Sequence, residues 1–581
     1  MAERENHGRP ERALSRRALL RGTAGVAAAL AAPGSLTRWR QTLRGYMAAP
    51  RGDATRHPLV INQTAQIGAT GSTMTMYHYD LYRTGWRQAP LTVDGFHRQG
   101  TLNLGSAVRA EPLLLEGWQP VAGPLAGQAA DLLFVCTSGN TLYCYDAAGL
   151  LAGNQQPVWM VPLGSATNRT GGYLFPEAGI QGTPVIDPTR REMYVVALLN
   201  DGTGTFEEPH ATYYFYIVDI DTGAIKNAVA FYDAGAPDRP AFDGNAQNER
   251  CALTLSNGRV WVAFSDFLES DAGEYYGWVV GVSVDDPSDQ VYWSVIKHEV
   301  GGGIWGQGGV IVRSDGTLYV STGNRPEDYP DYWAMLGDNR HPPDVGDYFN
   351  AIVRLRLDAQ TRSLSVVDWF MPTNVRELSA QDYDLSAGTP LLLENVGGRN
   401  LVVHCAKDGI VRLLDADRLG GWGGALASYP VFTGGPYGGS RGMPAHLRAP
   451  DGTDWVFIAG IGDPGVVAYT VQGGAQPALV ERWRTSGSEI VLGNTHGSPI
   501  ITGPAGSATI WLMNSDSDPA NGDDRGVPAL YGIDATTGRV VYSSMQNPAD
   551  GFTKVPHFAV TTPYANVLFV GTWDGLAWYG A

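Results

Sequence analysis

Three histidines stand at matching places in a pattern that recurs along the chain. His446, His496 and His557 each lie within three residues of the start of a short apolar run, on three consecutive repeats. Neutral imidazoles are good ligands for zinc, copper or iron, and they add no charge to a site. The spacing therefore predicts a metal site, and the alternative is that these histidines bind substrate or make structural hydrogen bonds.

Other polar and aromatic residues occupy equivalent positions just before an apolar run. Arginine can hold a carboxylate through two parallel hydrogen bonds, and tryptophan offers a flat face to a planar ring. They are candidates for substrate binding, although Trp305 could instead fill space, and Lys554 could bind an anion or pair with Asp382 and Asp384. The set comprises Arg250, Trp305, Gln307, Arg441 and Lys554, with Gln181 and Asn494 beside them.

The elements that carry these residues are repeats of about fifty residues. Each reads as an apolar run, a tight turn with Gly, an apolar run and then an acidic or aromatic residue, as at 132–146, 401–415 and 567–579. Alternating apolar residues around Gly139-Asn140 and Asp408-Gly409 predict two-residue hairpin turns. A chain of small antiparallel sheets with such a period is typical of a β-propeller.

Counting the repeats predicts an all-β fold, an eight-bladed β-propeller of four-stranded antiparallel blades. The last repeat ends after three strands, so we expect residues 100–105, near the N-terminus, to supply the fourth strand and close the ring. The loops before the innermost strands would then open on one face around the axis, where the candidate residues gather. These strands should begin near Ala110, Gly182, Cys251, Gly308, Gly388, Met443, Gly497 and Phe558.

At this level the chain resembles the quinoprotein alcohol dehydrogenase family of propellers. The resemblance rests on YDLYRTGW at 79–86, on the turns GIDATTG and IVDIDTG, and on Asp382-Tyr383-Asp384 ahead of an innermost strand. It implies that Asp382 or Asp384 is a general base beside pyrroloquinoline quinone and Ca²⁺. The alternative for the two aspartates is a turn that caps the strand start. The family's pair of adjacent cysteines has no counterpart in this sequence.

The first residues of the chain resemble a twin-arginine export signal. SRRALLR at 15–21 precedes an apolar run at 22–32 that is too short to span a bilayer. We expect an export signal at 1–32, a linker at 33–75 and the propeller at 76–581, in a periplasmic or extracellular protein without a membrane span. The alternative for the first segment is a basic tail.

Charge and cysteine content narrow the function classes. A net charge of −17 with only four lysines disfavours nucleic acid as a partner. Cys136, Cys144, Cys251 and Cys405 are predicted to be buried thiols, the first two on opposite faces of one hairpin. There is no CxxCH motif for haem attachment, so a redox role would require an external electron acceptor or oxygen.

Two loops also contain residues of interest. The segment 514–524 holds four aspartates, which favours a solvated loop over a Ca²⁺ site because the spacing differs from that of an EF-hand. The aromatic-rich segment 324–348 is long enough to act as a lid over the axial face.

Together these features predict an exported oxidoreductase that acts on a small hydroxylated or phenolic molecule in the axial pocket. Its cofactor would be pyrroloquinoline quinone with Ca²⁺, as the resemblance implies, or a copper, iron or zinc ion on the three histidines. The alternative is a cofactor-free propeller that serves as a binding or assembly scaffold.

Overall fold

A computed structural model describes residues 73–581 except 168–176, 205–208, 237–238, 267–274, 299, 326–329, 338 and 516–526. The chain divides into the units Met1–Pro58 and Leu59–Ala581, and every described residue belongs to the second. The expected export signal, the linker up to residue 72 and most of the aspartate-rich loop therefore lie outside the described residues. Met74, at the end of the expected linker, already pairs with Leu114.

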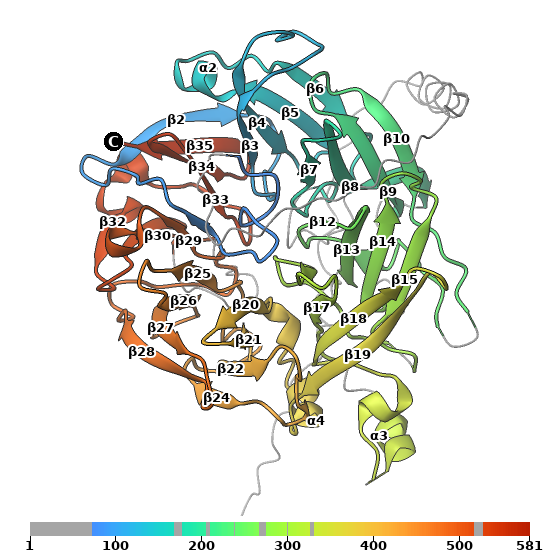
Figure 1. The fold of residues 1–581 in the computed structure, drawn as a ribbon. Helices are drawn as coiled ribbons and strands as arrows, with labels where there is room; N and C mark the ends of the chain where they lie inside the picture. The colour runs from blue at the N-terminus through green and yellow to red at the C-terminus, as the bar shows by residue number, and fades with distance from the viewer. Residues whose placement is uncertain are drawn as a thin grey trace, which may run out of the picture. The chain divides into compact units, whose positions relative to one another are not determined.

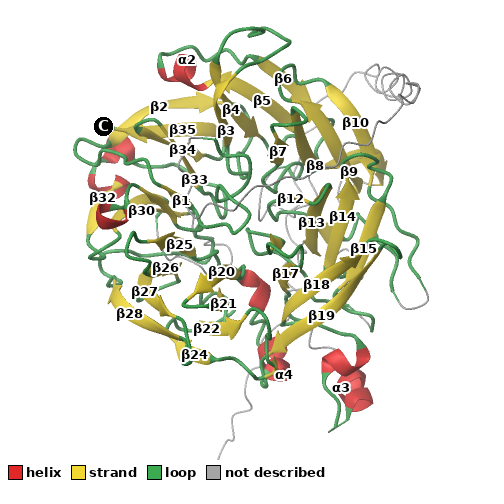
Figure 2. Ribbon diagram, in the orientation of Figure 1, coloured by secondary structure: helices red, strands yellow, loops and turns green. Residues whose placement is uncertain are grey.

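Eight antiparallel sheets follow one another around an axis in the described part of the chain (Figures 1 and 2). Each sheet is one blade, and its first strand lies nearest the axis. Blade 1 consists of β3 (Leu113–Trp118), β4 (Ala130–Cys136), β5 (Thr141–Asp146) and β6 (Trp159–Pro162), and blade 2 consists of β7 (Val185–Asp187), β8 (Glu192–Gly204), β9 (Pro209–Asp219) and β10 (Ile225–Ala230). Blade 3 consists of β12 (Thr254–Ser256), β13 (Arg259–Asp266), β14 (Trp278–Ser283) and β15 (Gln290–Ser294), and β11 (Gln247–Asn248) also pairs with β13. Blade 4 consists of β16 (Ile311–Val312), β17 (Leu318–Ser321), β18 (Ile352–Asp358) and β19 (Ser363–Met371), and β23 (Gly421–Trp422) also pairs with β19.

Blades 5 to 8 repeat this arrangement. Blade 5 consists of β20 (Leu391–Val396), β21 (Arg399–His404), β22 (Ile410–Asp415) and β24 (Ala427–Pro430), and blade 6 consists of β25 (Ala445–Arg448), β26 (Asp454–Ala459), β27 (Val466–Gln472) and β28 (Ala478–Arg484). Blade 7 consists of β29 (Ile500–Thr502), β30 (Thr509–Asn514), β31 (Ala529–Asp534) and β32 (Val540–Ser543). Blade 8 consists of β33 (Thr561–Tyr564), β34 (Val567–Gly571), β35 (Gly575–Gly580) and β2 (His97–Asn103).

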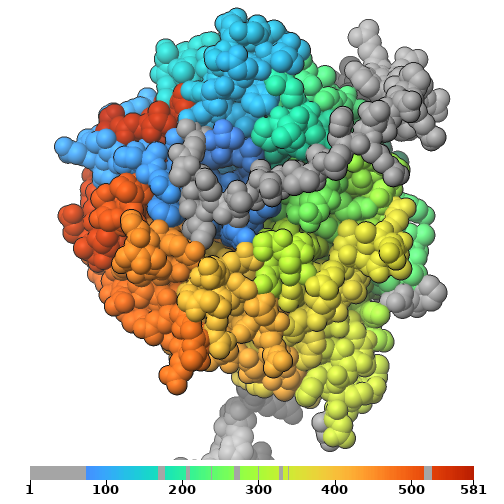
Figure 3. All heavy atoms as spheres, viewed as in Figure 1, coloured from blue at the N-terminus to red at the C-terminus, as the bar shows by residue number. Residues whose placement is uncertain are grey.

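The predicted fold is confirmed, including the closure of the ring. All eight innermost strands begin within a few residues of the predicted positions. The strand β2 pairs antiparallel with β35, with Thr101 opposite Ala577, so the N-terminal part of the propeller completes the last blade. In Figure 3 the blue atoms of this segment lie against the red atoms of the C-terminus. The outer side of β35 is therefore paired with a strand from the other end of the ring.

The core consists of apolar layers between neighbouring blades. Alternate residues of a strand point to opposite faces, so each blade contributes to the layers on both of its sides. Between blades 1 and 2, for example, Leu113 and Phe134 pack in one cluster with Val195 and Tyr216. This packing fixes the orientation of the blades and hence of the loops around the axis.

The hairpin turn between β4 and β5 differs from the prediction. Thr137 N donates to Thr141 O, which makes a three-residue loop in which only Asn140 has a positive φ, of 61°. Cys136 therefore lies opposite Leu142 and Cys144 opposite Phe134, on the same face. The predicted opposite faces were wrong because a shift of one residue in register reverses the face. All four cysteines are free and buried, as expected.

A segment ahead of the first blade crosses the axis, and we call residues 74–87 the plug. It includes the short strand β1 (Trp86–Arg87), which pairs in parallel with β29. Its hydrogen bonds reach the innermost strand, or the residues next to it, in every blade. The blade partners, in order, are Leu114, Ile186, Leu253, Gln307, Glu394, His446, Ile501 and Pro563. The plug thus connects the blades across the axis.

The described helices are short. They are α2 (Ala147–Leu151), α3 (Pro330–Leu336) and α4 (Val375–Ala380). Within the expected lid, α3 lies at the periphery of the ring (Figure 1), where Tyr332 and Leu336 pack into the core cluster of blades 3 and 4. The described part of that segment is therefore no lid over the axis. No described helix is long and apolar enough to cross a membrane.

Candidate functional site

The candidate site lies at the face where the innermost strands begin, which we call the strand-start face. Two kinds of loop reach it. The loops before the innermost strands carry Arg250, Trp305, Arg441 and Phe558. The turns between second and third strands also return to this face, because antiparallel strands reverse direction at each turn, and one of them carries Lys407. We call these five residues the axial cluster.

Trp305 is the centre of the axial cluster. The side chain is buried, and three cations from three blades lie near its ring. Arg250 Cζ lies 4.7 Å from the ring centroid, Lys407 Nζ 5.5 Å and Arg441 Cζ 5.6 Å. The Phe558 ring follows at 6.3 Å between centroids. An aromatic face attracts cations through its quadrupole, but it does not neutralise their charge.

Lys407 joins the axial cluster to the two predicted aspartates. Its Nζ lies 3.0 Å from each carboxylate oxygen of Asp382 and 2.6 Å from Asp384 Oδ2. Asn324 completes the group, since its backbone N donates to Asp384 Oδ1 at 2.7 Å and its side chain to Asp382 Oδ1 at 2.8 Å. Both predicted aspartates thus lie in one network with a cation that sequence reasoning did not single out.

The residues next to Asp384 explain its position. The helix α4 ends ahead of Asp382, which has a positive φ of 58°, and a single 3₁₀ turn at 385–387 follows Asp384. Asn350 Oδ1 accepts a hydrogen bond from Leu385 N at 2.9 Å, and His404 Nε2 lies 2.9 Å from Leu385 O. The Asp384 side chain makes no capping hydrogen bond to this turn. Its carboxylate is available to Lys407 and Asn324.

Lys554 was expected to pair with the two aspartates or to bind an anion, and among the described residues it forms no ion pair with either aspartate. Lys554 is exposed, and its Nζ lies 4.2 Å from the centroid of the Trp573 ring. Lys407 takes its place because the turn after a second strand opens on the same face as the loop before a first strand. That topological relation was the signal that could have identified Lys407 and Asn324 from the sequence.

The structure does not bring the three histidines together as one metal site. His446 Nε2 lies 2.7 Å from Asp454 Oδ1 at the far end of the β25–β26 hairpin, where Arg448 also binds Asp454. His496 lies beside Arg441, whose backbone N donates to His496 Nε2. Among the described residues, no group of three or more His, Cys, Asp or Glu side chains is placed to hold a metal ion.

His557 lies among cations rather than among ligands. Burial, together with Arg109, Arg250, Lys554 and Arg441, lowers the pKa of His557 to about 3. A neutral imidazole surrounded by four positive groups is a poor setting for a further cation. It is a favourable setting for an anion.

The remaining predicted residues divide between binding and structure. Gln307 connects the plug to blade 8: its amide donates to Phe558 O, and its Oε1 accepts from Tyr77 Oη at 3.0 Å. Gln181 accepts a hydrogen bond from Arg109. Gln307 is therefore a structural bridge, whereas the guanidinium of Arg250 lies beside the rings of Trp305 and Phe558 and forms no ion pair among the described residues.

Burial shifts the pKa values of several charged groups around the axis. Burial lowers the pKa of Arg250 and, with repulsion from Arg250, holds the pKa of Arg109 well below its ordinary range. Burial raises the pKa of Glu249 well above its ordinary value, although its Oε2 accepts from Gly182 N. The site therefore gathers several cations, and its two aspartate side chains share one of them, Lys407.

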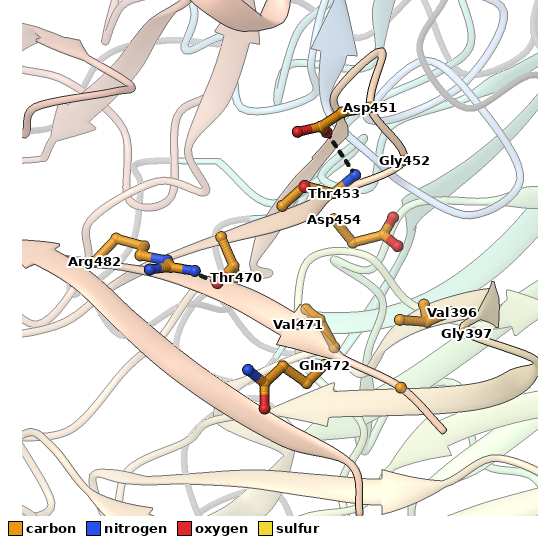
Figure 4. A pocket seen from close by; sticks show the side chains of 11 residues that line it. Val396, Gly397, Asp451, Gly452, Thr453, Asp454, Thr470, Val471, Gln472 and Arg482 are labelled. Carbon is orange, nitrogen blue, oxygen red and sulfur yellow. Dashed lines mark hydrogen bonds between the residues drawn. The ribbon is translucent and has the colours of Figure 1, made fainter. Parts of the chain in front are cut away.

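A groove elsewhere offers no comparable chemistry. It is an open depression of about 330 Å³ between blades 5 and 6 (Figure 4). Its Asp454 already binds His446 and Arg448, and its Arg482 donates to Thr470 Oγ1 at 2.8 Å. The axial cluster remains the candidate site.

Comparisons with known proteins support the fold. No protein-family model matches the chain, and no curated protein matches it. Among solved structures, the quinohemoprotein alcohol dehydrogenase of Comamonas testosteroni is similar, with a TM-score of 0.57, 14% identity, and coverage of 88% of this chain and 81% of the other. A europium-containing methanol dehydrogenase is also similar, with a TM-score of 0.54, 11% identity, and coverage of 87% of this chain and 91% of the other. The chain has the propeller fold of quinoprotein dehydrogenases, as its resemblance implied.

Proposed function

We propose that the chain is an oxidoreductase that oxidises a small hydroxylated molecule at the axial cluster, with a quinone of the pyrroloquinoline type as cofactor. The observation that supports this most is the Asp384 carboxylate, held 2.6 Å from Lys407 Nζ beside the Trp305 ring. A positioned carboxylate can accept the hydroxyl proton of an alcohol. The neighbouring ammonium holds that carboxylate in place.

The described residues fit the quinone better than they fit a metal. Pyrroloquinoline quinone is planar and carries three carboxylates, and the cluster offers an indole face flanked by Arg441 and Lys407. The Asp382 and Asp384 oxygens, which could otherwise bind Ca²⁺, are already held by the ammonium of Lys407. The chain thus supplies its own cation at that point.

Each residue has a defined part in this account. A bound quinone supplies the two-electron acceptor for the hydride that leaves the hydroxyl-bearing carbon. Asp384 accepts the hydroxyl proton at its carboxylate, Lys407 and Asn324 hold that carboxylate in place, and Trp305 provides the flat surface. Electrons then pass to an external acceptor.

The test is dye reduction by the purified protein after loading with pyrroloquinoline quinone, in CaCl₂ or in EDTA. We expect alcohol-dependent turnover that falls by roughly 100-fold or more in Asp384→Asn, because the proton acceptor is lost. Asp358→Asn, in an exposed turn, is the matched control and keeps full turnover. Equal turnover in Asp384→Asn and wild type would contradict the proposal, and no turnover at all would favour the cofactor-free scaffold.

We also propose export by the twin-arginine route, on the basis of the residues at 15–21. Replacing Arg16 and Arg17 by Lys should retain the protein in the cytoplasm, as measured by cell fractionation. Export unchanged by this substitution would contradict the assignment.

A further inference from the structure

We propose that the substrate of the axial cluster is a planar hydroxycarboxylate whose carboxylate binds Arg250 and whose body lies between that guanidinium and Asp384. This inference rests on the proposed oxidation at Asp384 and names the class of molecule that is oxidised. An aromatic acid with a hydroxymethyl group has the required chemistry: a flat ring, an anionic end and a hydroxyl.

The first argument is the setting of Arg250. Its guanidinium lies 4.7 Å from the centroid of Trp305 and 5.0 Å from that of Phe558. Its Nε is buried without a hydrogen-bond partner, and no carboxylate of the described residues forms an ion pair with it. Guanidinium groups in proteins usually donate to carboxylates or carbonyls, so this one retains its donors for a ligand.

The second argument is the number of cations that share the site. Arg250, Lys407 and Arg441 come from blades 3, 5 and 6 and lie near one indole ring. Arg109 and Lys554, from blades 1 and 8, add to the positive potential around His557. Like charges converging in a partly buried place repel one another, and an anionic ligand would offset that repulsion.

The third argument is that the nearby carboxylates do not neutralise Arg250. Asp382 and Asp384 form their ion pairs with Lys407. Glu249 follows Asn248 into the same loop, but its Oε2 accepts from a backbone N and burial favours its neutral form. Asp266 and Asp384 favour the charged form of Arg250, but Arg250 forms an ion pair with neither, so a ligand carboxylate would be its direct partner.

These positions also define how a hydroxycarboxylate would lie. Arg250 and Lys407 both lie beside the Trp305 ring, at 4.7 Å and 5.5 Å from its centroid, and Lys407 Nζ lies 2.6 Å from Asp384 Oδ2. A carboxylate on Arg250 then directs the other end of the molecule toward Asp384. A neutral alcohol of the same shape would lack this anchor.

The experiment compares two matched probes, 4-(hydroxymethyl)benzoate and 4-methylbenzyl alcohol, in the quinone-loaded protein. We expect kcat/KM to be at least about 10-fold higher for the benzoate, since a charge-assisted contact is added. Arg250→Gln should remove that preference while leaving the neutral alcohol within about twofold, and Arg250→Lys should restore part of it. The control is Arg484→Gln, an exposed arginine paired with Glu481 on β28.

Binding is measured separately in the protein without quinone, by calorimetric titration with 4-methylbenzoate at low salt. We expect binding in wild type and in Arg484→Gln, and at least about 10-fold weaker binding in Arg250→Gln. Benzoate binding without any quinone-dependent oxidation would support the anion site and contradict the proposed oxidoreductase. Oxidation of both probes at equal rates, without benzoate binding, would overturn this inference and leave the proposed oxidoreductase standing.

Discussion

Arg83 in the plug and Arg250 in the axial cluster are two arginines near the same axis with opposite surroundings. Arg83 is fully buried and donates to Tyr77 O at 2.7 Å, Leu253 O at 2.9 Å and Thr254 Oγ1 at 2.6 Å, although its Nε, like that of Arg250, has no hydrogen-bond partner. Arg250 is only partly buried, and its neighbours are the rings of Trp305 and Phe558. The first guanidinium is used to join parts of the fold, and the second is left to receive a ligand.

The same difference separates the two regions as a whole. The plug binds all eight blades through hydrogen bonds that close on the protein itself. In the axial cluster the two aspartates form their ion pairs with Lys407, and Arg250 takes part in no ion pair among the described residues. A partly buried cation without an ion pair costs stability, so retaining one favours a function outside the fold.

The largest expected effect is on stability. Arg83→Met leaves two backbone carbonyls and the Thr254 hydroxyl without their donors and should lower the free energy of unfolding by about 3 kcal/mol or more. Arg250→Met removes a repelling charge and should change it by less than about 1 kcal/mol. Urea unfolding of the two variants measures the difference, and equal losses would contradict the comparison.

Lys407→Gln should have the next largest effect. It leaves the Asp382 and Asp384 carboxylates close together without their cation, so we expect a loss of about 2 kcal/mol in unfolding free energy and weaker dye reduction. Added Ca²⁺ should then restore part of both, because a metal ion could replace the ammonium. A variant with unchanged unfolding and turnover would show that Lys407 does not hold the aspartates.

Tyr77→Phe tests the connection between the two regions. The Tyr77 hydroxyl donates to Gln307 and lies 2.8 Å from Ser498 Oγ, and Gln307 in turn bonds to Phe558 O. Loss of the hydroxyl should lower the free energy of unfolding, measured by thermal unfolding, by about 1 kcal/mol. Benzoate affinity should stay within about twofold, since the cations are unaffected. A large loss of affinity at unchanged stability would mean that the plug also shapes the site.

His404 supplies the smallest effect, and it depends on pH. Burial lowers the pKa of His404 to about 4 from its ordinary 6.5, so folding favours the neutral ring. The stability that this preference gives the folded protein is fully present above pH 6.5 and is lost as the pH falls toward 4. Between pH 7.5 and pH 5.5, the free energy of unfolding of wild type should therefore fall by about 1 kcal/mol more than that of His404→Asn. Parallel pH profiles of thermal unfolding for the two proteins would contradict the assignment.

The sequence predicts the scaffold better than it predicts the site. The period, the innermost strand starts and the closing strand follow from apolar alternation and turn residues, which depend on local backbone preferences. The hairpin at 138–140 was one residue too short in the prediction, and that error placed Cys136 and Cys144 on opposite faces. A turn type alone decides such a detail.

The candidate site required contacts between distant parts of the chain. Asp382, Asp384, Arg250, Trp305 and Arg441 were identified because they precede innermost strands, and the structure places them around one indole ring or its lysine neighbour. Lys407 and Asn324 were missed because their turns follow second strands. His446 was misjudged because its place in β25 directs it to Asp454.

The most direct test of the central claim is a crystal structure of the protein soaked with pyrroloquinoline quinone and 4-(hydroxymethyl)benzoate. The account predicts quinone density against Trp305, and benzoate density with its carboxylate on Arg250 and its hydroxyl within hydrogen-bond distance of Asp384. Ligand density at another place, or Arg250 and Phe558 unchanged against Trp305 at saturating ligand, would contradict it.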